Sequence, residues 1–230
     1  MRRLASRRQR ERLGLFVCEG EDLVAAALER GIHPVEVLVD AERPPLLDGL
    51  GDAEPVDPRL LGEVSALAHP PRVIALFRRA DLPQLDAADA PPVGLALWHV
   101  GDPGNIGTLL RTADGVGPAF VALSPGCGDP TGPKALRASA GAIFRVPLGR
   151  FDDAPRPRAA LVTRGGTPLP ELELDERVTF VAGAEREGLP EDIIADSELR
   201  ATIPLTPDAE SLNVAVSAAI ALYEWFRRHR

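Results

Sequence analysis

Short apolar segments alternate with helix-like segments from residue 93 onward, and this alternation limits the possible folds more than any other feature of the chain. We expect strands at 93–100, 119–123, 159–163 and 178–183, and helices at 105–114, 134–142 and 211–228. Strands that alternate with helices form a parallel sheet with helices on both faces. The expected fold class is therefore α/β, and ligands of such sheets bind at the carboxyl ends of the strands.

The first 80 residues show a smaller α/β pattern of their own. Strands are expected at 15–18, 35–39 and 73–77, and a helix at 21–30 that Gly31 closes. Residues 81–92 are rich in proline and aspartate, as linkers between domains often are. We therefore expect a small domain at 1–80, a linker at 81–92 and a larger domain at 93–230.

The charge of the chain argues against a uniformly basic nucleic-acid-binding protein. It carries 26 Lys and Arg against 34 Asp and Glu, for a net charge of -8. Six arginines nevertheless crowd the first twelve residues: Arg2, Arg3, Arg7, Arg8, Arg10 and Arg12. Such a run can hold a phosphate backbone locally, or it can be a solvated and frayed terminus, and the sequence leaves both readings open.

The cysteines and histidines form no recognisable metal-binding pattern. Cys18 and Cys127 are far apart, and the four histidines are scattered along the chain. We expect two free thiols and no metal, which favours a reducing compartment and hence the cytoplasm. The longest apolar segment, 214–226, is shorter than the roughly 20 residues that span a bilayer, so no membrane role is expected.

Three segments that follow expected strands carry residues suited to chemistry. The first is the glycine-rich turn at 101–107 with Arg111 in the next helix, which suits an anion or is an ordinary tight turn. The second is Gly183-x-Glu185-x-x-Gly188, where the carboxylate binds a ligand or is merely solvated. The third places Ile203 and Pro204 ahead of 211–214, where Ser211 is most simply the N-cap of the last helix.

The last helix is apolar on two sides. Its two stripes are Leu212, Val216, Ile220 and Tyr223 on one side, and Val214, Ala218, Leu222 and Trp225 on the other. A helix of this kind is buried on several sides. Either a second subunit or the rest of the chain itself can supply the cover.

Together these segments resemble the three motifs of a known enzyme family. Asn105-x-Gly107-x-x-x-Arg111, Gly183-x-Glu185-x-x-Gly188-Leu189 and Ile203-Pro204 with Ser211-Leu212-Asn213-Val214 look like those of the SpoU/TrmH branch of the SPOUT RNA ribose 2'-O-methyltransferases, in the same order and spacing. Two further stretches, 129–141 and 14–20, resemble the segment between the first two motifs and the start of the family's substrate-binding domain. The resemblance covers nearly the whole chain.

The resemblance implies a homodimeric α/β domain with a C-terminal trefoil knot that binds S-adenosyl-L-methionine, behind a ribosomal-protein-like domain that binds ribosomal RNA. By motif position, the cofactor-binding residues are Thr163, Gly183, Ile203 and Leu212. The catalytic residues are Asn105, Arg111, Glu185, Ser211 and Asn213, with Arg111 acting across the dimer interface. RNA contacts are expected from Arg7, Arg8, Arg10, Arg12, Lys134 and Arg137.

Two other functions remain open at this point. A protein that keeps the fold but only binds RNA is one, although all five residues of catalytic type are present in this chain. A nucleotide-cofactor oxidoreductase that uses the glycine-rich turn at 101–107 is the other. The turn has the spacing GxxGxxG, which is a weak match to the dinucleotide-binding pattern.

Overall fold

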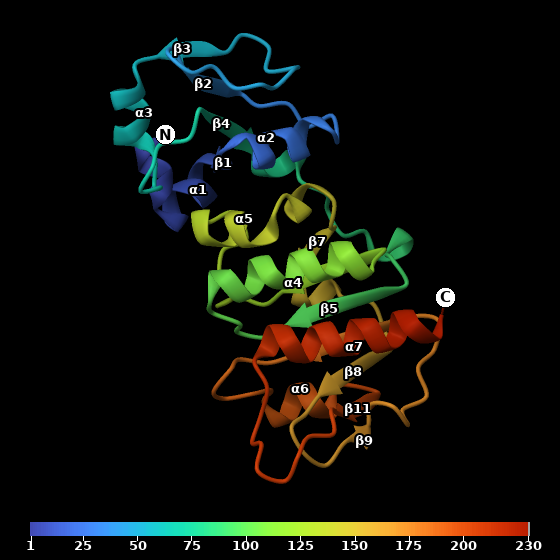
Figure 1. Ribbon diagram of the computed structural model, residues 1–230. Helices are drawn as coiled ribbons and strands as arrows, with labels where there is room; N and C mark the ends of the chain where they lie inside the picture. The colour runs from blue at the N-terminus through green and yellow to red at the C-terminus, as the bar shows by residue number, and fades with distance from the viewer. Residues whose placement is uncertain (230) are drawn as a thin grey trace.

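The computed structural model describes residues 1–229 and contains two sheets, with helices packed against each (Figure 1). The N-terminal sheet has four strands in the order β1-β4-β2-β3. Its strands are β1 (Leu15–Glu19), β2 (Glu36–Asp40), β3 (Glu54–Val56) and β4 (Val73–Arg78), and its helices are α1 (Arg7–Leu13), α2 (Glu21–Leu28) and α3 (Pro58–Val64). β4 runs antiparallel to both of its neighbours, β1 and β2.

The second sheet has seven strands in the order β7-β6-β5-β10-β8-β11-β9, and every neighbouring pair is parallel. The strands are β5 (Val93–Leu97), β6 (Ala119–Leu123), β7 (Leu148–Arg150), β8 (Arg158–Leu161), β9 (Thr167–Pro168), β10 (Val178–Ala182) and β11 (Leu199–Thr202). The helices are α4 (Pro103–Val116), α5 (Pro133–Ser139), α6 (Glu191–Ala195) and α7 (Val214–Arg228). The predicted α/β class with a parallel sheet is confirmed.

The central strands β5, β6 and β10 are apolar because both of their faces are buried. Leu95 and Phe180 point to the side that carries α4 and α7, where Leu110 and Leu222 complete the core. The opposite side holds a smaller cluster under α6 and the segment near 151, with Ala96, Phe120 and Val181 at its centre. A strand buried on both faces reads as a continuous apolar run, which is why these strands were legible in the sequence.

Several strands end earlier than expected, and this places more residues at the carboxyl edge of the sheet. β5 stops at Leu97 because His99 adopts a left-handed conformation, with φ of 52°, that turns the chain away. β8 stops at Leu161, which leaves Thr163 in the loop beyond it. The loops that follow β5, β8 and β10 therefore meet at one edge of the sheet.

The two sheets are joined through a shared hydrophobic core. Phe16 and Phe77 of the N-terminal sheet pack against Phe144, with ring centroids 6.2 and 5.5 Å from it. The segment expected as a linker also packs closely, because Leu85 N–H donates to the Leu148 carbonyl and Leu148 N–H donates to the Pro83 carbonyl. These contacts fix the N-terminal unit against the larger one.

The structure decides one local point that the sequence left open, and it differs from the sequence expectation at another. The arginine-rich start is not frayed in the structure, because residues 7–13 form α1 and Arg10 is buried. The N-cap of α7 is Asn213 and not Ser211, since the Asn213 Oδ1 atom accepts hydrogen bonds from the backbone N–H groups of Ala215 and Val216. Asn and Ser are about equally good caps, so propensity alone could not have chosen between them.

Candidate active site

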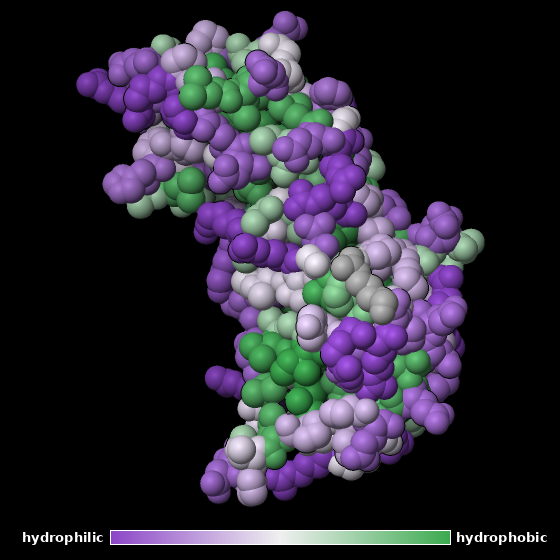
Figure 2. Space-filling model, turned by 45° about the vertical axis from the view of Figure 1, so that its right-hand side comes forward, coloured by the Kyte–Doolittle hydropathy of each residue, from purple (hydrophilic) through white to green (hydrophobic). Residues whose placement is uncertain are grey.

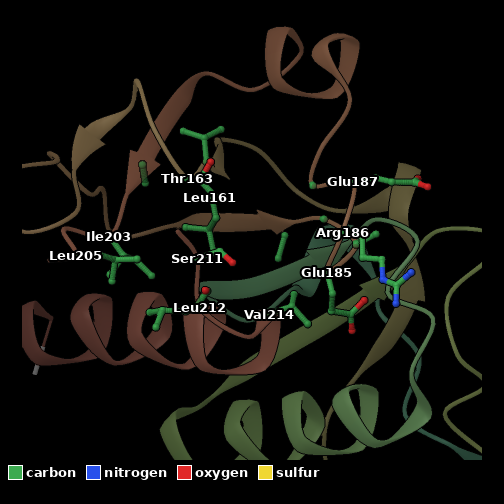
Figure 3. Close-up of a pocket in the computed structure, with 17 residues that line it drawn as sticks. Leu161, Thr163, Glu185, Arg186, Glu187, Ile203, Leu205, Ser211, Leu212 and Val214 are labelled. Atoms are coloured by element: carbon green, nitrogen blue, oxygen red, sulfur yellow. The ribbon is translucent and has the colours of Figure 1, made fainter. Parts of the chain in front are cut away.

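A cavity of about 270 Å³ opens at the carboxyl ends of β8, β10 and β11 (Figure 3). Its lining includes Thr163, Gly183, Ile203 and Leu212, the four residues expected to hold the cofactor, and also Glu185 and Ser211. The structure thus brings together residues from four separate segments of the chain. The walls combine apolar side chains, such as Leu161 and Val214, with polar groups at the rim. Walls of this mixed kind are typical of small-molecule sites.

The loop after β10 is shaped by its two glycines. A Cβ atom on Gly183 would lie 2.2 Å from the Gly188 carbonyl oxygen, so any larger residue there would collide with the backbone. Gly188 has φ of 67°, and its N–H donates to the Ala184 carbonyl at 2.9 Å. The glycines therefore let the loop fold back on itself, rather than clearing space for a ligand, and this fold presents Glu185 at the rim of the cavity.

Asn213, Asn105 and Glu185 form a hydrogen-bonded chain beside the cavity. Asn213 Nδ2 donates to Asn105 Oδ1 at 3.4 Å, and Asn105 Nδ2 donates to Glu185 Oε1 at 2.5 Å. The direction of the chain is fixed at one end, because Asn213 Oδ1 already accepts the N–H groups that begin α7. Glu185 is therefore required as an acceptor, a role that a carboxylate oxygen fills.

The start of α4 is held by a second set of contacts. Asp102 Oδ1 accepts from the Asn105 N–H at 3.0 Å, and Asp102 Oδ2 accepts from Lys134 Nζ at 2.6 Å. The Lys134 ammonium and the Asn105 N–H hold the pKa of Asp102 below its usual range. Asp102 followed by Pro103 is a helix-start signal that is readable in the sequence and places the start of α4 two residues before the expected position. Lys134, an expected RNA contact, is instead paired with Asp102 in this structure.

Gly107 serves helix packing rather than anion binding. A Cβ atom at this position would lie 2.3 Å from the Ala135 carbonyl oxygen of α5. α4 and α5 can therefore approach closely only if this residue is glycine. The close packing of α4 against α5 thus explains why position 107 of the glycine-rich segment is a glycine.

Arg111 is not bonded to the other expected catalytic residues in the described part of the chain. It is exposed on α4 and does not line the cavity. No hydrogen bond or ion pair joins its guanidinium to any other residue within 1–229. Within one chain, neither a hydrogen bond nor an ion pair therefore joins Arg111 to Glu185.

An open groove of about 540 Å³ runs between α4 and α7 and reaches Asn105 and Asn213. Three of the four residues of the first apolar stripe line it: Val216, Ile220 and Tyr223 are 47%, 37% and 57% exposed. The fourth, Leu212, lies before α7 and lines the cavity instead. The second stripe, which includes Ala218 and Leu222, is buried under the chain itself. Figure 2 shows hydrophobic surface in the lower half of the molecule, the half that holds the seven-stranded sheet.

The expected RNA-binding arginines fall into different environments. Arg8 and Arg12 on α1 and Arg137 on α5 are exposed, and none of the three is paired with any group in residues 1–229. Arg7 donates to Glu11 and to the Cys127 carbonyl. Arg10 is only 5% exposed and pairs with Asp129, so it is not available to RNA. Arg10 lies on the inner face of α1, so its side chain points into the molecule.

The remaining expectations concern metals, thiols and membranes. Cys18 and Cys127 are free and buried, as expected. Burial raises the pKa of the Cys18 thiol. In the part of the chain that the structure describes, no group of three His, Cys, Asp or Glu side chains could hold a metal ion. No helix of that part is long and apolar enough to cross a membrane.

A sequence profile described as the SpoU rRNA Methylase family matches residues 92–223, more than half of the chain. The chain belongs to this family. It is 30% identical to the 23S rRNA (guanosine(2553)-2'-O)-methyltransferase RlmP of Bacillus subtilis, over 96% of this chain and 92% of that protein. Membership makes the chain an RNA 2'-O-methyltransferase that depends on S-adenosyl-L-methionine.

Solved structures agree over almost the whole length of this SpoU methylase. A putative RNA methyltransferase of the TrmH family from Porphyromonas gingivalis superposes with a TM-score of 0.86 at 30% identity, covering 99% of this chain and 95% of that one. An AdoMet-bound rRNA methyltransferase from Sinorhizobium meliloti superposes with a TM-score of 0.87 at 25% identity, covering 99% and 92%. The match includes the N-terminal unit as well as the seven-stranded sheet.

Proposed function

We propose that this SpoU methylase methylates the 2'-oxygen of one ribose in ribosomal RNA, at a site that two copies of the chain build together. The observation that carries the proposal is the meeting of the cavity with the chain of hydrogen bonds from Asn213 through Asn105 to Glu185. The cavity offers a place for the methyl donor, and the hydrogen-bonded chain offers oriented polar groups at its rim.

The cavity suits S-adenosyl-L-methionine in chemistry. Its volume of about 270 Å³ lies just below the range of roughly 300–1,000 Å³ for small-molecule sites. Leu161, Ile203 and Leu212 offer apolar contact to an adenine ring, while Thr163 and Ser211 offer hydroxyl groups to polar parts of the donor. When bound there, S-adenosyl-L-methionine supplies an electrophilic methyl group.

The residues at the rim have distinct tasks in this proposal. Asn105 holds the Glu185 carboxylate by one oxygen, which leaves the second oxygen free to accept a hydrogen bond from the ribose 2'-hydroxyl. Holding the hydroxyl in line with the methyl group can supply several kcal/mol, out of the roughly 7–11 kcal/mol available in ideal intramolecular reactions. Ser211 stands at the same rim and completes the polar edge.

Arg111 is assigned to the site of the second copy. A guanidinium keeps its positive charge at neutral pH, so it suits the binding of phosphate and the stabilisation of a developing alkoxide better than the removal of a proton. Arg111 is exposed and unpaired within residues 1–229, on the same helix that borders the open groove. A second chain docked on the groove would receive this charge.

The apolar side chains of the groove support a homodimer. Val216, Ile220 and Tyr223 form a continuous exposed stripe along α7, and Thr108 and Thr112 of α4 form the facing edge. Exposed stripes of this kind mark protein interfaces. Because Asn105 and Asn213 line the same groove, the interface and the reaction site are continuous.

The knot that the family resemblance implies also belongs to this proposal. After β11 the chain returns through 203–213 beside the cavity, and α7 packs across β5 and β10 in the middle of the sheet. A return of this kind places the motifs around 183 and 211 against each other, which supports a knotted cofactor site.

The RNA path proposed here runs over the unpaired arginines. Arg8 and Arg12 lie on α1, and Figure 1 shows α1 beside α5, which carries Arg137. The start of α5 lies near the Arg10 side chain of α1, because a Cβ atom on Gly132, the residue before α5, would lie 3.4 Å from the Arg10 guanidinium. A basic strip over both units allows an acidic protein to bind RNA locally.

Transfer of labelled methyl groups tests the proposal directly. Ribosomal RNA from cells that lack the protein is incubated with the purified chain and labelled S-adenosyl-L-methionine, and 2'-O-methyl sites are then mapped on RNA from cells with and without it. We expect one new site. Calorimetry should show binding of S-adenosyl-homocysteine and not of NAD. Donor binding without any transfer would favour a non-catalytic RNA-binding protein, and NAD binding would favour an oxidoreductase.

A further inference from the structure

Arg186 is a cation at the rim of the cavity that none of the motif assignments uses. It follows Glu185 in the loop after β10 and lines the cavity together with Glu185 and Glu187. Figure 3 shows its side chain extending in the same direction as that of Glu185, whereas Glu187 points away. The guanidinium and the carboxylate that we assign to the ribose hydroxyl thus come from the same loop and line the same cavity, without an ion pair between them.

Among the described residues, the Arg186 guanidinium has no bonding partner. The side chain is exposed, and it makes no ion pair or hydrogen bond with any residue in 1–229, although two glutamates flank it. The other cations near the site are placed differently: Lys134 is tied to Asp102, and Arg111 lies outside the cavity. Within one chain, Arg186 is thus the cation that both lines the cavity and remains unpaired among the described residues.

The chemistry of RNA requires an anion close to this place. A ribose 2'-hydroxyl within an RNA strand stands on the carbon next to the one that bears the 3'-phosphate. Any site that holds the hydroxyl against Glu185 must therefore also accommodate this phosphodiester. Glu185 would face it with a negative charge, and Glu187 adds a second negative charge in the same loop, which disfavours binding unless a cation offsets them.

We propose that Arg186 binds the phosphate on the 3' side of the target ribose. This assignment rests on the proposed function and names a substrate contact within it. The planar guanidinium donates two parallel hydrogen bonds to phosphate oxygens, which orients the sugar as well as attracting the strand. Arg186 is then a substrate-binding residue of its own chain, whereas Arg111 acts on the site of the partner copy.

The first test compares substitutions of Arg186 with a matched control. Arg186→Ala should lower kcat/KM for RNA about 10- to 100-fold, in line with the loss of a charge-assisted hydrogen-bonded contact. The kcat/KM of Arg186→Lys should lie between those of this variant and the wild type, because lysine keeps the positive charge but cannot donate two parallel hydrogen bonds. Arg200→Ala removes an equally exposed and unpaired arginine on β11 that does not line the cavity, and it should leave kcat/KM unchanged.

The second test identifies the phosphate itself. Wild-type enzyme should lose activity on an RNA that carries one uncharged methylphosphonate on the 3' side of the methylated ribose, whereas Arg186→Ala should lose little more. The slope of log KM against log salt should also fall by about 0.7 in Arg186→Ala, the value for one phosphate contact to a single strand. Affinity for S-adenosyl-homocysteine should not change.

The outcomes separate this inference from the proposed function. Wild-type protein that transfers no methyl group to RNA would overturn the proposed function and the assignment with it. Active wild-type protein with an Arg186→Ala variant of equal kcat/KM, or with an undiminished methylphosphonate penalty in that variant, would overturn the assignment of Arg186 alone. A drop in donor affinity in Arg186→Ala would place the residue in the cofactor site instead and would equally overturn the assignment.

Discussion

Arg10 and Asp129 form an ion pair at 2.8 Å across the boundary between the two units, and each is only 5% exposed. Arg79 adds a third charge, with its guanidinium 3.2 Å from the other carboxylate oxygen of Asp129. The neighbouring Gly128 packs against the turn before α4, since a Cβ atom there would lie 3.0 Å from the Gly101 carbonyl oxygen. The pair therefore ties the arginine-rich N-terminus to the turn that positions Asn105.

We expect Asp129→Asn to destabilise the protein by about 3–5 kcal/mol, because it leaves the buried Arg10 guanidinium without its counter-charge. Chemical denaturation at neutral pH measures the change. Arg2→Ala serves as the control, since it breaks the exposed Arg2–Glu63 pair of the same unit and should cost less than about 1 kcal/mol. Equal losses in the two variants would show that burial of the Arg10–Asp129 pair has no energetic consequence.

The same pair predicts a pH dependence of stability. Burial raises the pKa of Asp129, but hydrogen bonds from Thr131 and Arg10 and the charge of Arg79 outweigh it, so the pKa lies below its usual range. A carboxyl whose pKa is lowered by folding stabilises the protein above its unfolded pKa of about 3.9, and that contribution disappears as the pH falls through the folded pKa. The stability gap between wild type and Asp129→Asn should therefore be widest near pH 7 and shrink below about pH 4, as urea denaturation across this range can measure.

The sequence predicted the large sheet better than the contacts that join the two units. Strands such as β6 and β10 are buried on both faces and are apolar except for Thr179, so their pattern is local and readable. The Arg10–Asp129 pair joins residues 119 positions apart, and no local pattern marks an arginine that points inward. The arginine run therefore looked uniform in sequence, although its members have different partners.

Contacts between residues far apart in the sequence were also not predictable at the candidate site. Most of the residues that the family motifs named lie at the cavity or in the hydrogen-bonded chain beside it, and Arg111 does not. The direction of the Asn213–Asn105–Glu185 chain depends on which residue caps α7. Arg186 was not singled out because its exposure and lack of partners are properties of the folded loop. In the sequence, its position directly after Glu185 was the feature that could have marked it as a site residue.

Asn213 has two roles that substitutions can separate. Asn213→Ala should lose about 1 kcal/mol of stability, since the α7 N-cap disappears, and should also lose activity. Asn213→Ser keeps a capping oxygen but is too short to reach Asn105, so we expect near wild-type stability with an activity loss of at least tenfold. Thermal unfolding and single-turnover methyl transfer measure the two effects. Wild-type activity in Asn213→Ser would mean that its bond to Asn105 is not needed for the reaction.

The exposed stripe of α7 predicts the oligomeric state. Ile220→Glu places a charge in the middle of the groove, where burial against a second copy would cost several kcal/mol. We expect sedimentation to show a dimer for the wild type and a monomer for Ile220→Glu, with activity reduced at least tenfold in the monomer. Leu46→Glu, at an apolar residue that is 87% exposed in the N-terminal unit, is the control and should stay dimeric. A fully active Ile220→Glu monomer would contradict the proposal of a shared site.

Arg111 allows the sharing of the site to be tested by mixing two inactive chains. Arg111→Ala and Arg111→Lys should each keep stability within about 0.5 kcal/mol of the wild type, because the side chain is exposed and unpaired among the described residues. Both should lose about 100-fold in kcat, since lysine cannot reproduce two parallel hydrogen bonds to phosphate. Near wild-type turnover of Arg111→Lys would count against this bidentate role.

The mixing experiment decides which chain uses Arg111. A heterodimer of Arg111→Ala with Glu185→Gln contains one complete site if Arg111 serves the partner, because the intact Glu185 then meets the intact Arg111 of the other chain. Random reassortment makes half of the dimers mixed, each with one working site of two, so activity should recover to roughly a quarter of the wild-type value. If Arg111 served its own chain, every site in the mixture would lack one of the two residues, and activity would stay at the level of the separate variants. Since the folded chain keeps Arg111 outside its own cavity, we expect recovery.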